Sequence, residues 1–241
     1  MSEDVFRRTL VVIDGSESGL EACRQVAQLS QAEGPVDAVG VVHFATATDT
    51  GEADEALDEA MALLDDRAVR RRIDGFVTSA LLAELRTFDA TLVAFGSSDH
   101  RRAGDILLGG SAGELLHKAP CSVLVARPSD PATFPQTIVV GHDGSPDADV
   151  ALTAARELAQ RLDSSLQVVT SLAGRLVDHA RLGEVGVTTV AEPPVVALVE
   201  AARDADLLVV GSRGLHGVEA LGSVSERVAY DAPCSVLVVR G

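Results

Sequence analysis

The stretch Asp206-Leu-Leu-Val-Val-Gly-Ser-Arg-Gly214, with Gly222-Ser-Val-Ser-Glu226 and Ala232-Pro-Cys-Ser-Val-Leu-Val-Val239 after it, decides the fold of this chain. An aspartate followed by four apolar residues and a glycine is typical of a strand that is buried on both faces and ends abruptly. Gly222 and Ser223 stand where a helix begins. Its unpaired N–H groups and positive dipole end suit a phosphate. The alternative is that Ser223 and Glu226 form a capping box and the glycines only turn the chain.

The same pattern occurs twice in the sequence. An apolar run leads into Asp14-Gly-Ser16 and again into Asp143-Gly-Ser145. The strand that ends at Gly211 has a counterpart that ends at Gly96, and the final Ala-Pro-Cys-Ser-Val-Leu-Val is also present around Cys121. Repetition of this kind indicates a tandem duplication.

The spacing between the copies shows where they differ. The offset is 129 residues at Asp14/Asp143, 115 at Gly96/Gly211 and 113 at Cys121/Cys234. The second copy has therefore lost 14 residues in the middle of the domain and two more in the loop after the fourth strand.

Apolar strands alternate with helical periodicity in each copy. This alternation predicts an α/β fold with two doubly wound domains, each a parallel sheet covered by helices on both faces. We expect the domains at 1–128 and 136–241, joined by a short stiff linker, Arg127–Pro135, with three prolines. An acidic amphipathic helix follows the second strand of the first copy, and about Val177–Leu182 remains of it in the second.

Composition excludes several classes of function. A net charge of −16, from 36 acidic and 20 basic residues, argues against nucleic acid as a partner. The run Arg70-Arg71-Arg72 is expected to be solvated surface. Neither a leader pattern nor an apolar stretch of bilayer length is found, which predicts a cytoplasmic protein without a membrane partner. Three cysteines without CxxC spacing predict buried thiols, and six scattered histidines predict no metal site.

The common phosphate loops are missing. The first strand does not lead into G-x-G-x-x-G, and no G-x-x-x-x-G-K-[ST] is present. What remains is Asp-Gly-Ser after the first strand, Gly-Ser-x-Gly after the fourth, Gly-Ser at the last helix, and Ala-Pro-Cys-x-Val-Leu-Val. This combination resembles the universal stress protein family, in its tandem form, across essentially the whole chain.

The resemblance implies a fold and a ligand. It implies five-stranded sheets of order 3-2-1-4-5 that bind an adenine nucleotide, here ATP with or without Mg²⁺, and fifth strands that pair across a dimer. We therefore expect Ser122–Ala126 and Ser235–Val239 to pair in an intramolecular pseudo-dimer, which would also cover apolar sheet edges. Further association into a homodimer is a second expectation.

The family's nucleotide motif is Gly, two residues, Gly, nine residues, Gly and then Ser or Thr. Carried over by position, Gly211, Gly214, Gly222 and Ser223 would surround the phosphates. Asp143 would meet the ribose or adenine. The end of the second strand, at Val168 and Val169, would flank the base. The matching positions in the first copy are Asp14, Val42, Gly96, Gly109 and Gly110.

Both copies depart from that motif. Seven residues, not nine, separate Gly214 from Gly222 in the second copy. The first copy keeps the nine-residue spacing, but Asp99 replaces a glycine and Gly110 takes the Ser/Thr place. A carboxylate there would repel phosphate, so we expect the second domain to be the stronger site.

The sequence contains no catalytic constellation. His142, beside Asp143, is equally compatible with a strand-end residue and with a general base. We therefore expect no enzyme. The leading hypothesis is an ATP-binding stress protein that changes protein partners. The alternatives are a scaffold that binds proteins but no nucleotide, and a slow ATP hydrolase.

Overall fold

The structure is a computed structural model that describes residues 5–13, 16–30, 38–45, 50–64, 68–74, 78–97, 111–172, 182, 186–212 and 223–241. The chain divides into two compact units, Glu3–Pro131 and Ala132–Gly241, which we call the first and the second domain. Each domain is described by itself.

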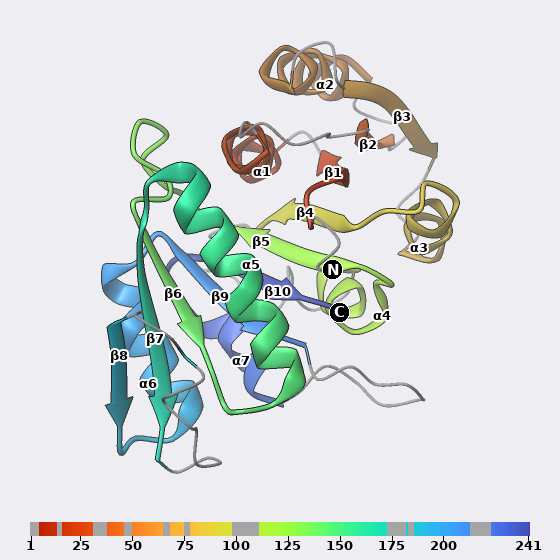
Figure 1. Cartoon of the computed structure of the whole chain (residues 1–241). Helices are drawn as coiled ribbons and strands as arrows, with labels where there is room; N and C mark the ends of the chain where they lie inside the picture. The colour runs from red at the N-terminus through yellow and green to blue at the C-terminus, as the bar shows by residue number, and fades with distance from the viewer. Residues whose placement is uncertain are drawn as a thin grey trace. The chain divides into compact units, whose positions relative to one another are not determined.

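The first domain is a parallel sheet with helices on both faces. Strand pairing gives the order β3-β2-β1-β4-β5. In Figure 1, α1 and α2 lie on one face of this sheet, and α3 and α4 lie on the other. The elements are β1 (Arg8–Ile13), α1 (Glu17–Leu29), β2 (Ala38–Ala45), α2 (Thr50–Leu64), β3 (Ala68–Asp74), α3 (Thr78–Thr87), β4 (Leu92–Gly96), α4 (Ser111–Lys118) and β5 (Ser122–Ala126).

The second domain repeats this arrangement. Its strands pair in the order β8-β7-β6-β9-β10, again all parallel. In Figure 1, α5 covers one face of its sheet, and α6 and α7 cover the other. The elements are β6 (Thr137–Gly141), α5 (Pro146–Leu162), β7 (Ser165–Ser171), β8 (Gly186–Val190), α6 (Pro194–Ala201), the 3-10 turn η3 (Ala202–Asp204), β9 (Leu207–Gly211), α7 (Ser223–Asp231) and β10 (Ser235–Val239). The predicted α/β class is confirmed.

The core sits between sheet and helices, as the apolar periodicity predicts. Strand β4 buries four consecutive residues, which fits a strand covered on both faces. On α2, Leu57, Ala60 and Leu64 are buried, whereas Glu55 and Asp58 are exposed, so the predicted amphipathic helix is confirmed. The expected remnant at Val177–Leu182 lies outside the described residues, except for Leu182, which is fully buried.

The three cysteines are free and buried, as predicted. Cys23 lies on the face of α1 that packs into the core and has no exposed surface. Burial raises the pKa of the Cys23 thiol to about 12, because the core disfavours a thiolate. A smaller effect of Arg24 lowers it, and one of Glu59 raises it. Cys23 is therefore an inert structural thiol.

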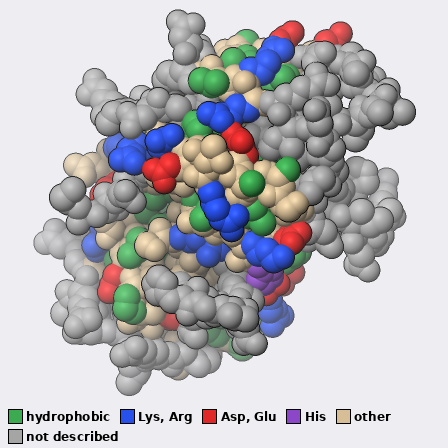
Figure 2. Space-filling model, turned by 90° about the vertical axis from the view of Figure 1, so that its right-hand side faces the viewer, with side chains coloured by type: hydrophobic (Ala, Val, Ile, Leu, Met, Phe, Trp, Pro, Cys, Tyr) green, Lys and Arg blue, Asp and Glu red, His purple; other side chains and the backbone are tan. Residues whose placement is uncertain are grey.

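The arginine run on β3 has specific partners. Arg70 is half-exposed and pairs with Asp58 of α2. Arg71 pairs with Glu84 of α3, and its guanidinium lies 4.6 Å from the centre of the Phe88 ring. The side chain of Arg71 is 33% exposed, so it lies at the surface as expected, but it also makes these specific contacts. On the face shown in Figure 2, Lys and Arg side chains lie among Asp, Glu and other side chains.

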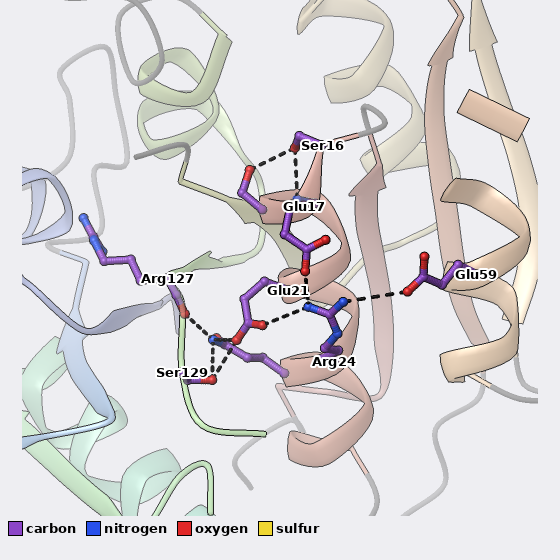
Figure 3. A network of polar contacts seen from close by, with 10 residues as sticks. Ser16, Glu17, Glu21, Arg24, Glu59, Arg127 and Ser129 are labelled. Carbon is purple, nitrogen blue, oxygen red and sulfur yellow. Dashed lines mark hydrogen bonds and ion pairs between the residues drawn. The ribbon is translucent and has the colours of Figure 1, made fainter. Parts of the chain in front are cut away.

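The first residues of the linker are held by hydrogen bonds to side chains of α1. Figure 3 shows Glu21 of α1 reaching the start of the linker. Glu21 accepts a hydrogen bond from Ser129 at 2.7 Å, and the amide of Gln25 donates to Glu21 at 2.8 Å and to the carbonyl of Arg127 at 2.7 Å. Side chains of α1 therefore hold the first residues of the linker, in addition to the stiffness that its prolines provide.

Candidate functional site

Three strand ends of the second domain line up at one edge of the sheet. Strand β6 lies between β7 and β9, with Gly141 opposite Val169 and Val140 opposite Val209. The N–H of His142 continues the ladder and donates to the carbonyl of Val169 at 3.0 Å. The turn at Asp143 therefore leaves the sheet at the edge where ligands of doubly wound folds bind.

The Asp143 turn is built from bonds between side chains and backbone. The carboxylate of Asp143 accepts from the N–H of Ser145 at 3.0 Å. Gly144 has φ 76°, a left-handed conformation that favours glycine. The hydroxyl of Ser145 then accepts from the N–H of Ala148 at 3.2 Å and caps α5. The Asp-Gly-Ser motif thus turns the chain from β6 into α5.

Gly211 ends β9 against the first turn of α5. A Cβ built on Gly211 would lie 2.5 Å from the carbonyl oxygen of Asp147. In the first domain, a Cβ on Gly96 would lie 1.9 Å from the carbonyl oxygen of Ser18. At both positions the close neighbour is a helix backbone. The glycine is therefore required for packing, whatever else it borders.

The first turn of α7 is hydrogen-bonded to the end of β9. Ser223 is the first residue of α7, and the buried hydroxyl of Ser225 donates to the carbonyl of Gly211 at 2.7 Å. By the offset at Cys121/Cys234, the matching residue of the first copy is Ala112, which lacks a hydroxyl. This hydrogen bond brings a helix N-terminus, with its positive dipole end, to the carboxyl edge of the sheet.

Ser212 carries a buried hydroxyl beside this junction. Its N–H donates to the carbonyl of Val239 at 2.8 Å, whereas its Oγ has no hydrogen-bond partner. A buried polar group without a partner is unusual and suits a place that receives a polar ligand.

The remaining expected residues of the second copy divide into two groups. Val168 and Val169 lie on β7 at the same edge, with their side chains buried in the domain. Gly214 and Gly222 lie outside the described residues.

In the first domain, the structure places two of the expected site residues. Gly96 ends β4, and Val42 lies on β2 opposite Val12 and Arg71. Asp14, Gly109 and Gly110 lie outside the described residues. The helix start next to Asp14 repeats that of the second domain, since Ser16 accepts from the N–H of Gly19 at 3.1 Å.

The structure adds a pair that sequence reasoning missed. The side chain of His142 is 2% exposed, and its Nε2 lies 3.1 Å from a carboxylate oxygen of Asp149. Its Nδ1 lies 3.2 Å from the N–H of Gly144 and must accept there, so Nε2 is the protonated nitrogen. Both ring nitrogens are thus engaged, and a strand-end role fits better than that of a general base.

Within the described ranges, no group of three or more His, Cys, Asp or Glu side chains is arranged to hold a metal ion. None of the helices that the structure describes is long and apolar enough to cross a bilayer.

Comparison with known proteins identifies the family. The model of the universal stress protein family matches residues 6–127 and again 173–240. The chain belongs to this family. It carries the family domain in tandem, although the second match begins after β7 and so leaves out β6, α5 and the Asp143 turn.

A curated universal stress protein of Mycolicibacterium smegmatis is 32% identical over 182 residues. That alignment covers 63% of this chain and 62% of the relative's length. Among solved structures, a universal stress protein of Archaeoglobus fulgidus superposes with a TM-score of 0.71 at 21% identity, over 96% of this chain and 97% of that one. One of Pseudomonas aeruginosa gives 0.74 at 18% identity, over 98% and 93%. These two structures support the fold.

Proposed function

We propose that this universal stress protein binds an adenine nucleotide, ATP, in its second domain and uses it to regulate interactions with other proteins. The observation that carries the proposal is the hydrogen bond from Ser225 to Gly211. It fixes the N-terminus of α7 at the strand edge that Asp143 and Val169 also reach, and helix N-termini are favourable places for phosphates.

Three parts of the second domain offer contacts for ATP. Ser223 and the first N–H groups of α7 would face phosphate oxygens, the buried hydroxyl of Ser212 could donate to the ligand, and Asp143 would meet the ribose or adenine. Two carboxylates, Asp147 and Asp149, stand in the first turn of α5 and oppose an anion. Mg²⁺ bound with ATP would offset their charge.

Nucleotide release tests the proposal directly. Purified protein is denatured, and the supernatant is analysed for adenine nucleotides by chromatography. Calorimetric titration of nucleotide-free protein with ATP, with and without Mg²⁺, then gives the affinity. ATP binding that weakens on Ser225→Ala and recovers on Ser225→Thr, which retains a hydroxyl, supports the site. Absence of both released and titrated nucleotide would instead favour the protein-binding scaffold.

We propose that ATP is a regulatory ligand rather than a rapidly consumed substrate. No described residue at the strand edge combines an accessible nucleophile with an assigned base, because both nitrogens of His142 are engaged. We expect ATP turnover below about 1 per second. A faster rate that disappears on Asp143→Ala would contradict this and favour the hydrolase.

The expected pairing of the two fifth strands, β5 and β10, remains a prediction from the family resemblance, as do a homodimer and a protein partner. An experimental structure in which both strands have exposed, unpaired edges would contradict the pairing. Sedimentation analysis would test the homodimer.

A further inference from the structure

His142 and Asp149 form a polar pair where the other copy has an apolar one. By the offset of 129 residues, His142 corresponds to Ile13 and Asp149 to Leu20. Ile13 and Leu20 are both buried in the first domain. Both members of the pair are therefore apolar in the first copy and polar in the second. One member lies at the end of the strand before the Asp-Gly-Ser turn, and the other lies on the helix after it.

The polar pair is connected to that turn by a specific bond. Asp149 accepts from Nε2, which leaves Nδ1 as the acceptor for the N–H of Gly144. Gly144 is the left-handed residue between Asp143 and Ser145. Isoleucine offers no acceptor, so the side chain at Ile13 cannot hold the corresponding glycine in this way.

We propose that His142 is a positioning residue, oriented by Asp149, that fixes the Asp143–Ser145 turn of the second domain for nucleotide binding. The inference rests on the proposed function, because it concerns how that site is held ready. A turn that is already ordered before binding loses less conformational freedom when the ligand arrives. The second domain, but not the first, would bind through such a fixed turn.

The test introduces the two apolar residues of the first copy into the second copy. His142→Ile with Asp149→Leu replaces the polar pair by the apolar pair that already occurs at the equivalent positions. In nucleotide-free full-length protein, we expect the amide of Gly144 to exchange with solvent roughly tenfold faster than in the wild type. We expect the affinity for ATP to fall by a similar factor.

Conservative variants separate positioning from general loss of structure. His142→Asn retains an acceptor near the place of Nδ1, so the amide of Gly144 should exchange as slowly as in the wild type. In His142→Gln the same amide should exchange faster. Asp149→Asn retains an acceptor oxygen for Nε2 and should change little. In the wild type, ¹⁵N NMR should show the neutral imidazole of His142 as the tautomer with its proton on Nε2.

The results decide the inference even if the proposed function fails. A neutral His142 imidazole with its proton on Nδ1, or unchanged exchange of Gly144 in the variant with His142→Ile and Asp149→Leu, would overturn it. Wild-type protein that binds no ATP would overturn the proposed function, and the exchange of Gly144 would still decide whether His142 holds the turn. Faster exchange with unchanged ATP affinity would overturn the assignment of this turn to nucleotide binding.

Discussion

The Cα of Gly211 faces the backbone carbonyl of Asp147, so closely that a Cβ at residue 211 would lie 2.5 Å from its oxygen. Gly96 and Ser18 repeat this relationship at 1.9 Å in the first domain. The glycine that closes the fourth strand of each copy therefore allows the first helix of that copy to pack. The packing of the fold alone therefore accounts for a glycine at this position of the motif.

Gly211→Ala should destabilise the protein by about 2 kcal/mol or more, because a helix backbone cannot move aside as a side chain can. Gly186→Ala on β8 is the matched control, since a Cβ there meets nothing within 4 Å. We expect the control to lie within about 0.5 kcal/mol of the wild type. Urea denaturation measures both values, and equal values for the two variants would refute the packing argument.

Nucleotide binding should be asymmetric between the copies. We expect one ATP per chain, bound in the second domain, because the first copy has Asp99 where the family's phosphate motif has a glycine, and a carboxylate repels phosphate. Gly222→Val should abolish binding, whereas the matched variant Gly109→Val should leave it unchanged. Calorimetry on the full chain gives stoichiometry and affinity. Binding lost on Gly109→Val or Asp14→Ala but retained on Gly222→Val would reverse the assignment.

The contact between α1 and the linker should contribute measurably to stability. Gln25→Ala should lower the free energy of unfolding by about 1–3 kcal/mol, because it leaves the buried oxygen of Glu21 and the carbonyl of Arg127 without this donor. Glu17→Ala is the control, since the Glu17 side chain is 77% exposed and its ion pair with Arg24 lies at the surface. We expect a loss of about 1 kcal/mol or less there. Similar losses in both variants would argue against the buried network.

Stability should fall at alkaline pH through Cys23. In the unfolded chain this thiol ionises near 9.0, but in the folded protein only near 12. Above pH 9 the unfolded state therefore loses a proton that the folded state keeps, and stability declines by up to about 1.4 kcal/mol per pH unit until pH 12. The Cys23→Ala variant should show a shallower decline. Identical slopes in chemical denaturation between pH 8.5 and 10.5 would rule this out.

The fold could be predicted from the sequence because its signals are local. Apolar runs such as Leu207–Val210 identify buried strands, and the helical period of α2 shows which side faces the core. The helix expected at Ser79–Leu85 is observed at Thr78–Thr87. It begins one residue earlier and ends two residues later than expected.

The side-chain hydrogen bonds that hold the site together could not be predicted in the same way. Ser225 and Gly211 are 14 residues apart, and their bond depends on how α7 returns to β9. His142 and Asp149 meet only because the turn folds α5 back over the strand end. Comparison of the copies provides a signal, since both positions change character together between Ile13/Leu20 and His142/Asp149. A single copy would not have revealed it.

Joining two copies in one polypeptide also changes what natural selection can alter. When identical chains assemble, each substitution appears in every subunit, so a change that harms one site harms all of them. Here a mutation at His142 leaves Ile13 untouched, and one at Ser225 leaves Ala112 untouched. One domain can therefore specialise while the other accumulates substitutions independently. The two domains are also always produced in equal amounts, because they belong to one polypeptide.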